Sequence, residues 1–167
     1  MEIKKKLQEL FVKHFNESPL TITALPASGS DRKYFRLKGA SRTAIGVYNP
    51  DRNENGTFIY FTTLFSKGKL PVPELYETSS NKETYLIQDL GEETLFDILI
   101  KEGFTERVKT LFRKSIDGLV KFHWEAGRKV DYTMCYAARA FDRQQILLDL
   151  LYFKYYFVDQ LKIQYDR

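Results

Sequence analysis

The chain has 167 residues, 43% of them apolar and 29% charged, which suits one globular core or two small lobes rather than a disordered polypeptide. A single cysteine, Cys135, excludes an internal disulfide framework and favours a reducing, cytoplasmic setting. The apolar runs are all shorter than the 18 or so residues of a membrane span, and the amphipathic start argues against a signal peptide. The net charge is +4, and the 26 lysines and arginines are scattered among 22 acidic residues. We therefore expect no membrane and no nucleic-acid partner.

The spacing of apolar residues in the first 90 positions predicts a helix, three strands, a second helix and two more strands. Ile3, Leu7 and Phe11 recur at helical spacing, whereas Phe35 and Leu37 alternate with polar residues as in a strand. The predicted elements are helix 1–15, strands 20–25, 33–38 and 43–48, helix 55–67 with Gly68 as its cap, and strands 74–78 and 83–88. This order predicts an α+β fold with a largely antiparallel five-stranded sheet.

Downstream of residue 90 the pattern is helical. Thr94 is expected to cap a short helix, with Asp97 completing the capping interaction. His123 lies on an apolar face of the next helix, so we expect it to be a core histidine. The predicted helices are 95–102, ended by Gly103, then 104–127, and after a poorly defined stretch at 131–140 a strongly apolar helix over 142–161.

The last of these helices contains the aromatic run 150–158. A run of this kind is more typical of a helix buried on several sides than of a ligand site. If its surface were uncovered, the apolar patch would favour self-association.

A polar turn that leads into a strand is the first candidate functional segment. Backbone N–H groups in such a turn can converge on a phosphate, and Gly29 allows a close approach. Ser28 and Ser30 offer hydroxyl donors, Arg32 offers a bidentate cation, and Asp31 could tune the loop or bond its own backbone. Taken alone, a turn with one glycine is more often an ordinary β-turn.

The second candidate segment lies about sixty residues later, where an apolar strand stops at Gln88, Asp89 and Leu90 and a helix opens soon afterwards. Such a break could present backbone groups to an adenine edge, or it could be a plain connection with Asp89 as a local cap. The order and separation of the two segments favour a nucleotide-binding lobe.

The runs Ser30-Asp31-Arg32-Lys33-Tyr34-Phe35-Arg36 and Leu86-Ile87-Gln88-Asp89-Leu90-Gly91 resemble motifs of the aminoglycoside phosphotransferase and choline kinase group. The closer resemblance is to its bacterial amino-sugar kinase branch, and the run 119–123 resembles the helix before the catalytic loop of that branch. The resemblance implies a kinase-like N-lobe over 1–90, followed over 91–167 by the hinge and the first helices of an incomplete helical C-lobe.

The same resemblance implies the ligands and their sites. ATP or another nucleoside triphosphate, with Mg²⁺ in the full-length enzyme, would lie with its phosphates under residues 28–32. The main chain at Gln88, Asp89 and Leu90 would contact adenine. The acceptor would be a hydroxyl of a small molecule, a sugar or an amino sugar.

Two departures from the kinase pattern stand out. The third predicted strand has no lysine to pair with the phosphates and with a helix glutamate, for which Glu54 is the candidate; Arg32 or Lys33 would have to supply the charge. Neither His14 nor His123 heads a catalytic loop, so we expect no catalytic residue and no metal ligand in this chain. We therefore expect the amino-terminal part of a longer phosphotransferase, inactive alone. The alternative is a non-catalytic kinase-like binding module.

Overall fold

The computed structural model describes residues 2–26 and 31–165 of the chain. These fall into two compact units, 1–131 and 132–167. The first unit includes the first helices after residue 90, and the predicted division into lobes at that residue remains a prediction.

The first unit is built on a five-stranded sheet in which every neighbouring pair of strands is antiparallel, in the order β1-β2-β3-β5-β4. The strands are β1 (Thr21–Ala24), β2 (Lys33–Lys38), β3 (Thr43–Tyr48), β4 (Leu75–Thr78) and β5 (Thr84–Gln88). The predicted α+β class and antiparallel sheet are confirmed, and the end of each strand lies within one residue of its prediction. Strand β2 alternates between buried and less buried residues, whereas β3 is buried at four successive positions because each face of the sheet is covered by a helix.

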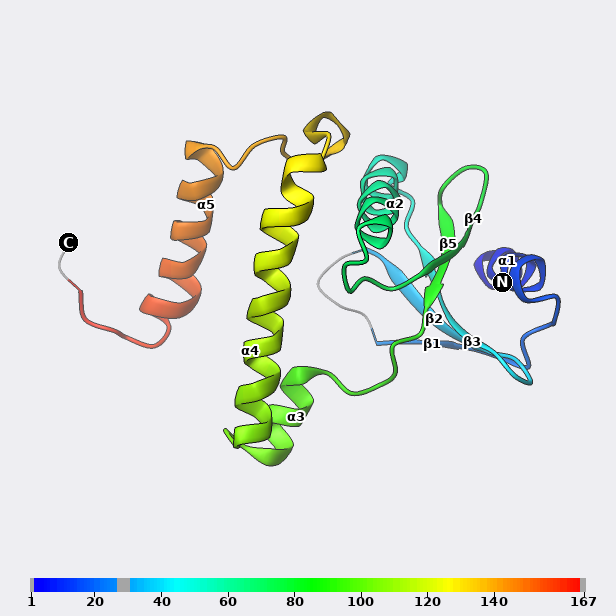
Figure 1. Ribbon diagram of the computed structural model, residues 1–167, viewed down its shortest axis with the longest axis horizontal. Helices are drawn as coiled ribbons and strands as arrows, with labels where there is room; N and C mark the ends of the chain where they lie inside the picture. Colours follow the sequence, from blue (N-terminus) through cyan, green and yellow to red (C-terminus); the bar gives the residue numbers. More distant parts are fainter. Residues whose placement is uncertain (1, 27–30, 166–167) are drawn as a thin grey trace. The chain divides into compact units, whose positions relative to one another are not determined.

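Helix α1 (Glu2–Phe15) covers one face of the sheet and α2 (Arg52–Lys67) covers the other, as Figure 1 shows. Beneath α1, Leu7 and Phe11 pack against Leu37 of β2 in a fully buried cluster. Beneath α2, the ring of Phe58 stacks on that of Tyr85 at 5.1 Å between centroids. The core of this unit is therefore two apolar layers with the sheet between them.

Gly46 in the middle of β3 lets α1 approach the sheet closely. A Cβ atom at this position would lie 2.8 to 2.9 Å from side-chain carbons of Leu37 and Leu7. Such a distance is shorter than real Cβ contacts, so any larger residue would push α1 outward or distort β2.

Helix α2 begins at Arg52, three residues before the predicted start. Asp51 caps it, because its carboxylate accepts the backbone N–H groups of Asn53 and Glu54. The first turn carries polar residues, so apolar periodicity could not reveal it. Gly68 is the C-cap, as predicted.

The helical part of the first unit contains α3 (Leu95–Glu102) and α4 (Glu106–Lys121). The predicted capping box is confirmed, since Thr94 and Asp97 exchange side-chain and backbone hydrogen bonds. The end of α4 widens into a π-helical turn over 122–126 and then a 3₁₀ turn over 127–129, where a single α-helix was predicted.

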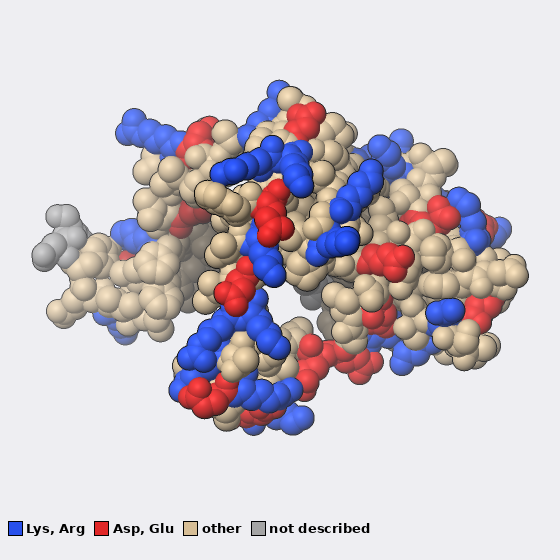
Figure 2. Space-filling model, in the orientation of Figure 1, with Lys and Arg blue, Asp and Glu red and all other residues tan. Residues whose placement is uncertain are grey.

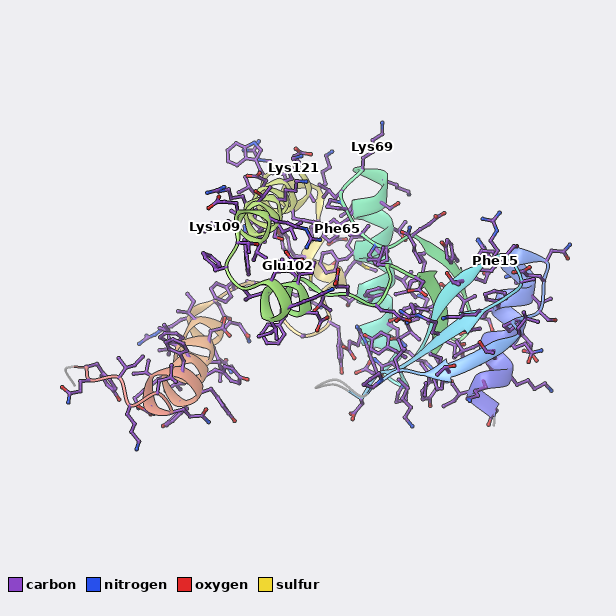
Figure 3. All side chains as sticks on the ribbon, turned by 90° about the horizontal axis from the view of Figure 1, so that it is seen from below. Phe15, Phe65, Lys69, Glu102, Lys109 and Lys121 are labelled. Carbon is purple, nitrogen blue, oxygen red and sulfur yellow. The ribbon has the colours of Figure 1, made fainter. Side chains whose placement is uncertain are left out.

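The π-helical turn that follows α4 contacts α2 through Phe122, whose ring meets that of Phe65 edge-on at 5.1 Å; Figure 3 shows Phe65 on the side of α2 toward α4. His123 is the next residue around the helix and is exposed. The prediction of a core histidine is wrong, because the apolar face that carries His123 is not the face that packs against α2.

The second unit contains a 3₁₀ turn over 132–134, helix α5 (Arg143–Phe153) capped by Asp142, and a π-helical turn over 154–159. Among its described residues, 132–165, none is buried. The aromatic run is thus exposed rather than covered on several sides. In the part of the chain that the structure describes, no helix is long and apolar enough to cross a membrane.

Candidate functional site

An ion pair joins the start of β2 to the first turn of α2. The guanidinium Nη2 of Arg32 lies 3.0 Å from Oε1 of Glu54. The other carboxylate oxygen of Glu54 accepts a 2.7 Å hydrogen bond from Nδ2 of Asn49, which is itself buried. The carboxylate is therefore held on both sides, and it in turn holds Arg32 against the edge of α2.

The Arg32 guanidinium also makes a cation–π contact. Its central carbon is 5.4 Å from the centroid of the Phe58 ring, which stacks on Tyr85. Burial raises the pKa of the Tyr85 phenol well above its ordinary value, and the nearby charge of Arg32 opposes that rise only in part. Tyr85 is therefore neutral at physiological pH, and Glu54 is the anion that balances the charge of Arg32.

The ion pair does not satisfy every donor of Arg32. Its side chain is only 16% exposed, and Nε is buried without a hydrogen-bond partner among the residues that the structure describes. A buried N–H without an acceptor is costly, so this guanidinium can gain from an additional anion.

A second cluster lies where the chain leaves β5. Arg36, on the same side of the sheet as Arg32, binds both carboxylate oxygens of Asp89, with Nε–Oδ2 at 2.8 Å and Nη2–Oδ1 at 3.1 Å. It also donates to the backbone oxygen of Gly91 at 2.8 Å and to Oε1 of Glu92 at 2.5 Å. We call residues 88–92 the hinge segment and the four bonds of Arg36 the Arg36 clasp.

The structure describes five of the eight predicted site residues. Ser28, Gly29 and Ser30 lie outside the described residues. Asp31 is exposed beside Arg32. The remaining three predicted residues all lie in the hinge segment: Gln88, Asp89 and Leu90.

The three hinge residues differ in what they can offer a ligand. The backbone N–H of Gln88 is used within the sheet, donating to the carbonyl of Glu74 at 2.8 Å. The carboxylate of Asp89 is occupied by Arg36 and by the N–H of Gly91. Leu90 is 71% exposed, so it is the one of these three residues most open to a ligand.

Sequence reasoning missed the roles of Asn49, Arg36 and Glu92. Arg36 and Asp89 both belong to the quoted motifs, but their pairing depends on the order of strands in the sheet. The available signal was the alternation in β2, which places Tyr34 and Arg36 on one face, with Arg32 immediately before the strand.

Neither cluster is a metal site. Among the residues that the structure describes, no group of three or more His, Cys, Asp or Glu side chains could hold a metal ion. Glu54 is engaged by Arg32 and Asn49, and Asp89 by Arg36. The residues present therefore fit an anionic ligand and not a divalent cation.

A separate apolar cavity of about 570 Å³ lies between α3 and α4. Leu95 and Ile98 of α3 face Leu111 and Leu119 of α4 across it, and Lys114 contributes the only cationic group among the lining residues that the structure describes. None of its lining residues belongs to the Arg32 or Arg36 clusters, so it is not the place for a triphosphate.

Comparison of the sequence with known proteins finds similarity to part of two bacterial proteins. No family model matches the sequence. A protein of Pseudomonas putida is 28% identical over 123 residues, which are 72% of this chain and 35% of that protein. One of Pseudomonas aeruginosa is 30% identical over 120 residues, 70% of this chain and 34% of that protein.

Both relatives are named N-acetylmuramate/N-acetylglucosamine kinase. The chain spans about a third of the length of these curated relatives. It is therefore similar to one part of a bacterial sugar kinase.

Proposed function

We propose that this chain is the nucleotide-binding part of an ATP-dependent amino-sugar kinase of the aminoglycoside phosphotransferase and choline kinase group. The ion pair between Arg32 and Glu54 is the observation that carries the proposal. In kinase-type lobes a lysine of the third strand pairs with a glutamate of the following helix and with the phosphates. Here β3 has no lysine, and Arg32 meets the helix glutamate instead.

Arg32 would bind the phosphates of the nucleotide together with the backbone of residues 28–31. A guanidinium presents a planar fork of N–H donors that matches phosphate oxygens, and it stays charged at every physiological pH. Glu54 and Asn49 would hold this fork in place, and Nε, which has no acceptor among the described residues, would gain one when the anion binds. Asp31 is exposed next to the fork and would face the same phosphates.

The base would lie against the hinge segment. The backbone N–H of Gln88 is bonded to Glu74, so contacts to adenine would come from the remaining main-chain groups up to Leu90. These groups follow the buried strand β5, whose hydrogen bonds to β3 and β4 fix where they emerge.

The names of the relatives suggest N-acetylmuramate or N-acetylglucosamine as the phosphate acceptor. The catalytic base and the ligands of Mg²⁺ would come from polypeptide outside this chain, because the clusters described above contain neither. The chain by itself would then bind nucleotide, in the cytoplasm, without transferring its phosphate.

A non-catalytic binding module is the alternative. The missing lysine of β3 and the single glycine of the loop favour it. Such a module would either bind no nucleotide or bind it equally well after Arg32 is removed.

Titration of Mg·ATP into the purified chain, followed by calorimetry and amide NMR, tests the proposal. We expect shifts at 31–32 and 88–90, and an affinity loss of about tenfold to a hundredfold in Arg32→Ala, since a hydrogen bond to a charged group contributes about 1.5–3 kcal/mol. Arg52→Ala is the matched control. Arg52 begins α2 and forms a similar ion pair, to Glu83 just before β5. An equal loss in both variants would assign the effect to net charge, and no binding by the unaltered chain would contradict the proposal.

A further inference from the structure

The Arg36 clasp joins two parts of the chain that are not neighbours in the sheet. Arg36 lies on β2 and the hinge segment follows β5, with β3 between them. Ile45 of β3 is paired with Arg36 on one side and with Ile87 on the other. The side chain of Arg36 must therefore reach across β3 to bind Asp89.

The pair of Arg36 and Asp89 within the clasp is largely shielded from water. The side chains of Arg36 and Asp89 are 11% and 9% exposed. Both carboxylate oxygens of Asp89 are used by the guanidinium, and Oδ1 also accepts the N–H of Gly91 at 3.0 Å. An ion pair with this geometry and burial restricts both partners far more than an exposed pair does.

The hinge segment depends on these bonds for its course. After Gln88 the chain leaves the sheet, and the next regular element is α3, which begins at Leu95. Gly91 has a φ of +97°, so the backbone turns there in a way that glycine alone adopts readily. Arg36 is bonded to the residues on either side of this turn and to the carbonyl of Gly91 itself.

We propose that Arg36 is a positioning residue, which fixes the main chain of the hinge segment so that it can receive a purine base. This inference rests on the proposed function and deepens it, since it assigns the two motif arginines to different halves of one ligand. Arg32 serves the phosphates directly. Arg36, four residues further along the chain, serves the base through Asp89 and Gly91.

Comparing Mg·ATP with Mg·tripolyphosphate separates these roles, because tripolyphosphate has the charges of the nucleotide and no base. We expect Arg36→Lys, which keeps the charge but loses the fork, to weaken ATP binding about tenfold and to leave tripolyphosphate binding within about twofold. Arg32→Ala should weaken both ligands by similar factors. Glu92→Gln, which removes the charge of one exposed contact of the clasp but keeps an acceptor there, should weaken ATP alone by a smaller factor.

Each outcome of these titrations decides the question. Unchanged ATP affinity in Arg36→Lys and Glu92→Gln would overturn the positioning role while leaving the proposed function intact. Equal losses for ATP and tripolyphosphate would overturn it as well, since they would indicate general damage to the sheet. If the unaltered chain did not bind Mg·ATP, the proposed function would fail and the hinge role with it, whether or not tripolyphosphate bound.

Discussion

The sheet region, residues 2–90, and the region of α5, residues 132–165, are both rich in apolar side chains but use them differently. In the sheet region Leu7, Phe11 and Leu37 are fully buried between helix and strand. In the α5 region, leucines and aromatic rings surround the helix, and none of the described residues is buried. Apolar composition forms a core only where a second apolar surface is present to meet it.

Charged residues show the same contrast. In the sheet region ion pairs join separate elements, as Arg36 with Asp89 and Lys13 with Glu77 do. In the α5 region Lys154 pairs with Asp159, only five residues away. Figure 2 shows acidic and basic side chains interspersed over the visible face, so surface charge does not distinguish the regions. The two regions differ instead in whether the ion-pair partners come from separate elements or from nearby positions in the chain.

The largest expected effect compares two phenylalanines. Phe11→Ala removes a fully buried ring beneath α1 and should lower the free energy of unfolding by about 3–5 kcal/mol. Phe153→Ala removes an exposed ring of α5 and should change it by less than about 0.5 kcal/mol. Urea unfolding of both variants measures the difference. A similar loss from Phe153→Ala would mean that α5 belongs to a buried core after all.

A second prediction concerns the exposed surface of α5, which should cause the chain to self-associate. Leu151→Glu places a charge in this surface and should weaken association about tenfold, because the charge would have to be buried at the contact. Gln144→Glu adds the same charge at a polar position of the same helix and should have little effect. Sedimentation velocity over a range of concentrations measures both. A monomeric unaltered chain would contradict the prediction.

The smallest expected effect is the pH dependence of one ion pair. The hydrogen bond from Lys13 holds the pKa of the Glu77 carboxylate below its ordinary value. Because the folded pKa lies below the unfolded one, this stabilisation is present above the unfolded pKa, about 4.3, and is lost as the pH falls through the folded pKa.

Lys13→Gln should therefore reduce the loss of stability between pH 7 and pH 3 by less than about 1 kcal/mol, since Lys13 is mostly exposed. Lys5→Gln removes the same charge from α1 without involving Glu77 and serves as the control. Equal pH dependence in the two variants would show that the pair contributes nothing to stability.

Local signals in the sequence predicted most of the elements. The strands were found because short apolar or alternating runs are bounded by turn residues, and the start of α3 because Thr94 and Asp97 form a capping box within four residues. The early start of α2 was missed because its first turn is polar. The exposure of His123 was missed because periodicity identifies an apolar face without showing whether anything covers it.

The sequence by itself determined the order of elements, the antiparallel α+β class and the two motifs, because these depend on neighbouring residues and their periodicity. Only the tertiary structure decided that Arg32 meets Glu54 and that Arg36 meets Asp89. Those pairs are 22 and 53 residues apart in the chain, and their contact depends on which strands are adjacent and which faces they turn toward α2. Burial is likewise a property of the partners that surround a residue, which is why α5 remained exposed despite its apolar sequence.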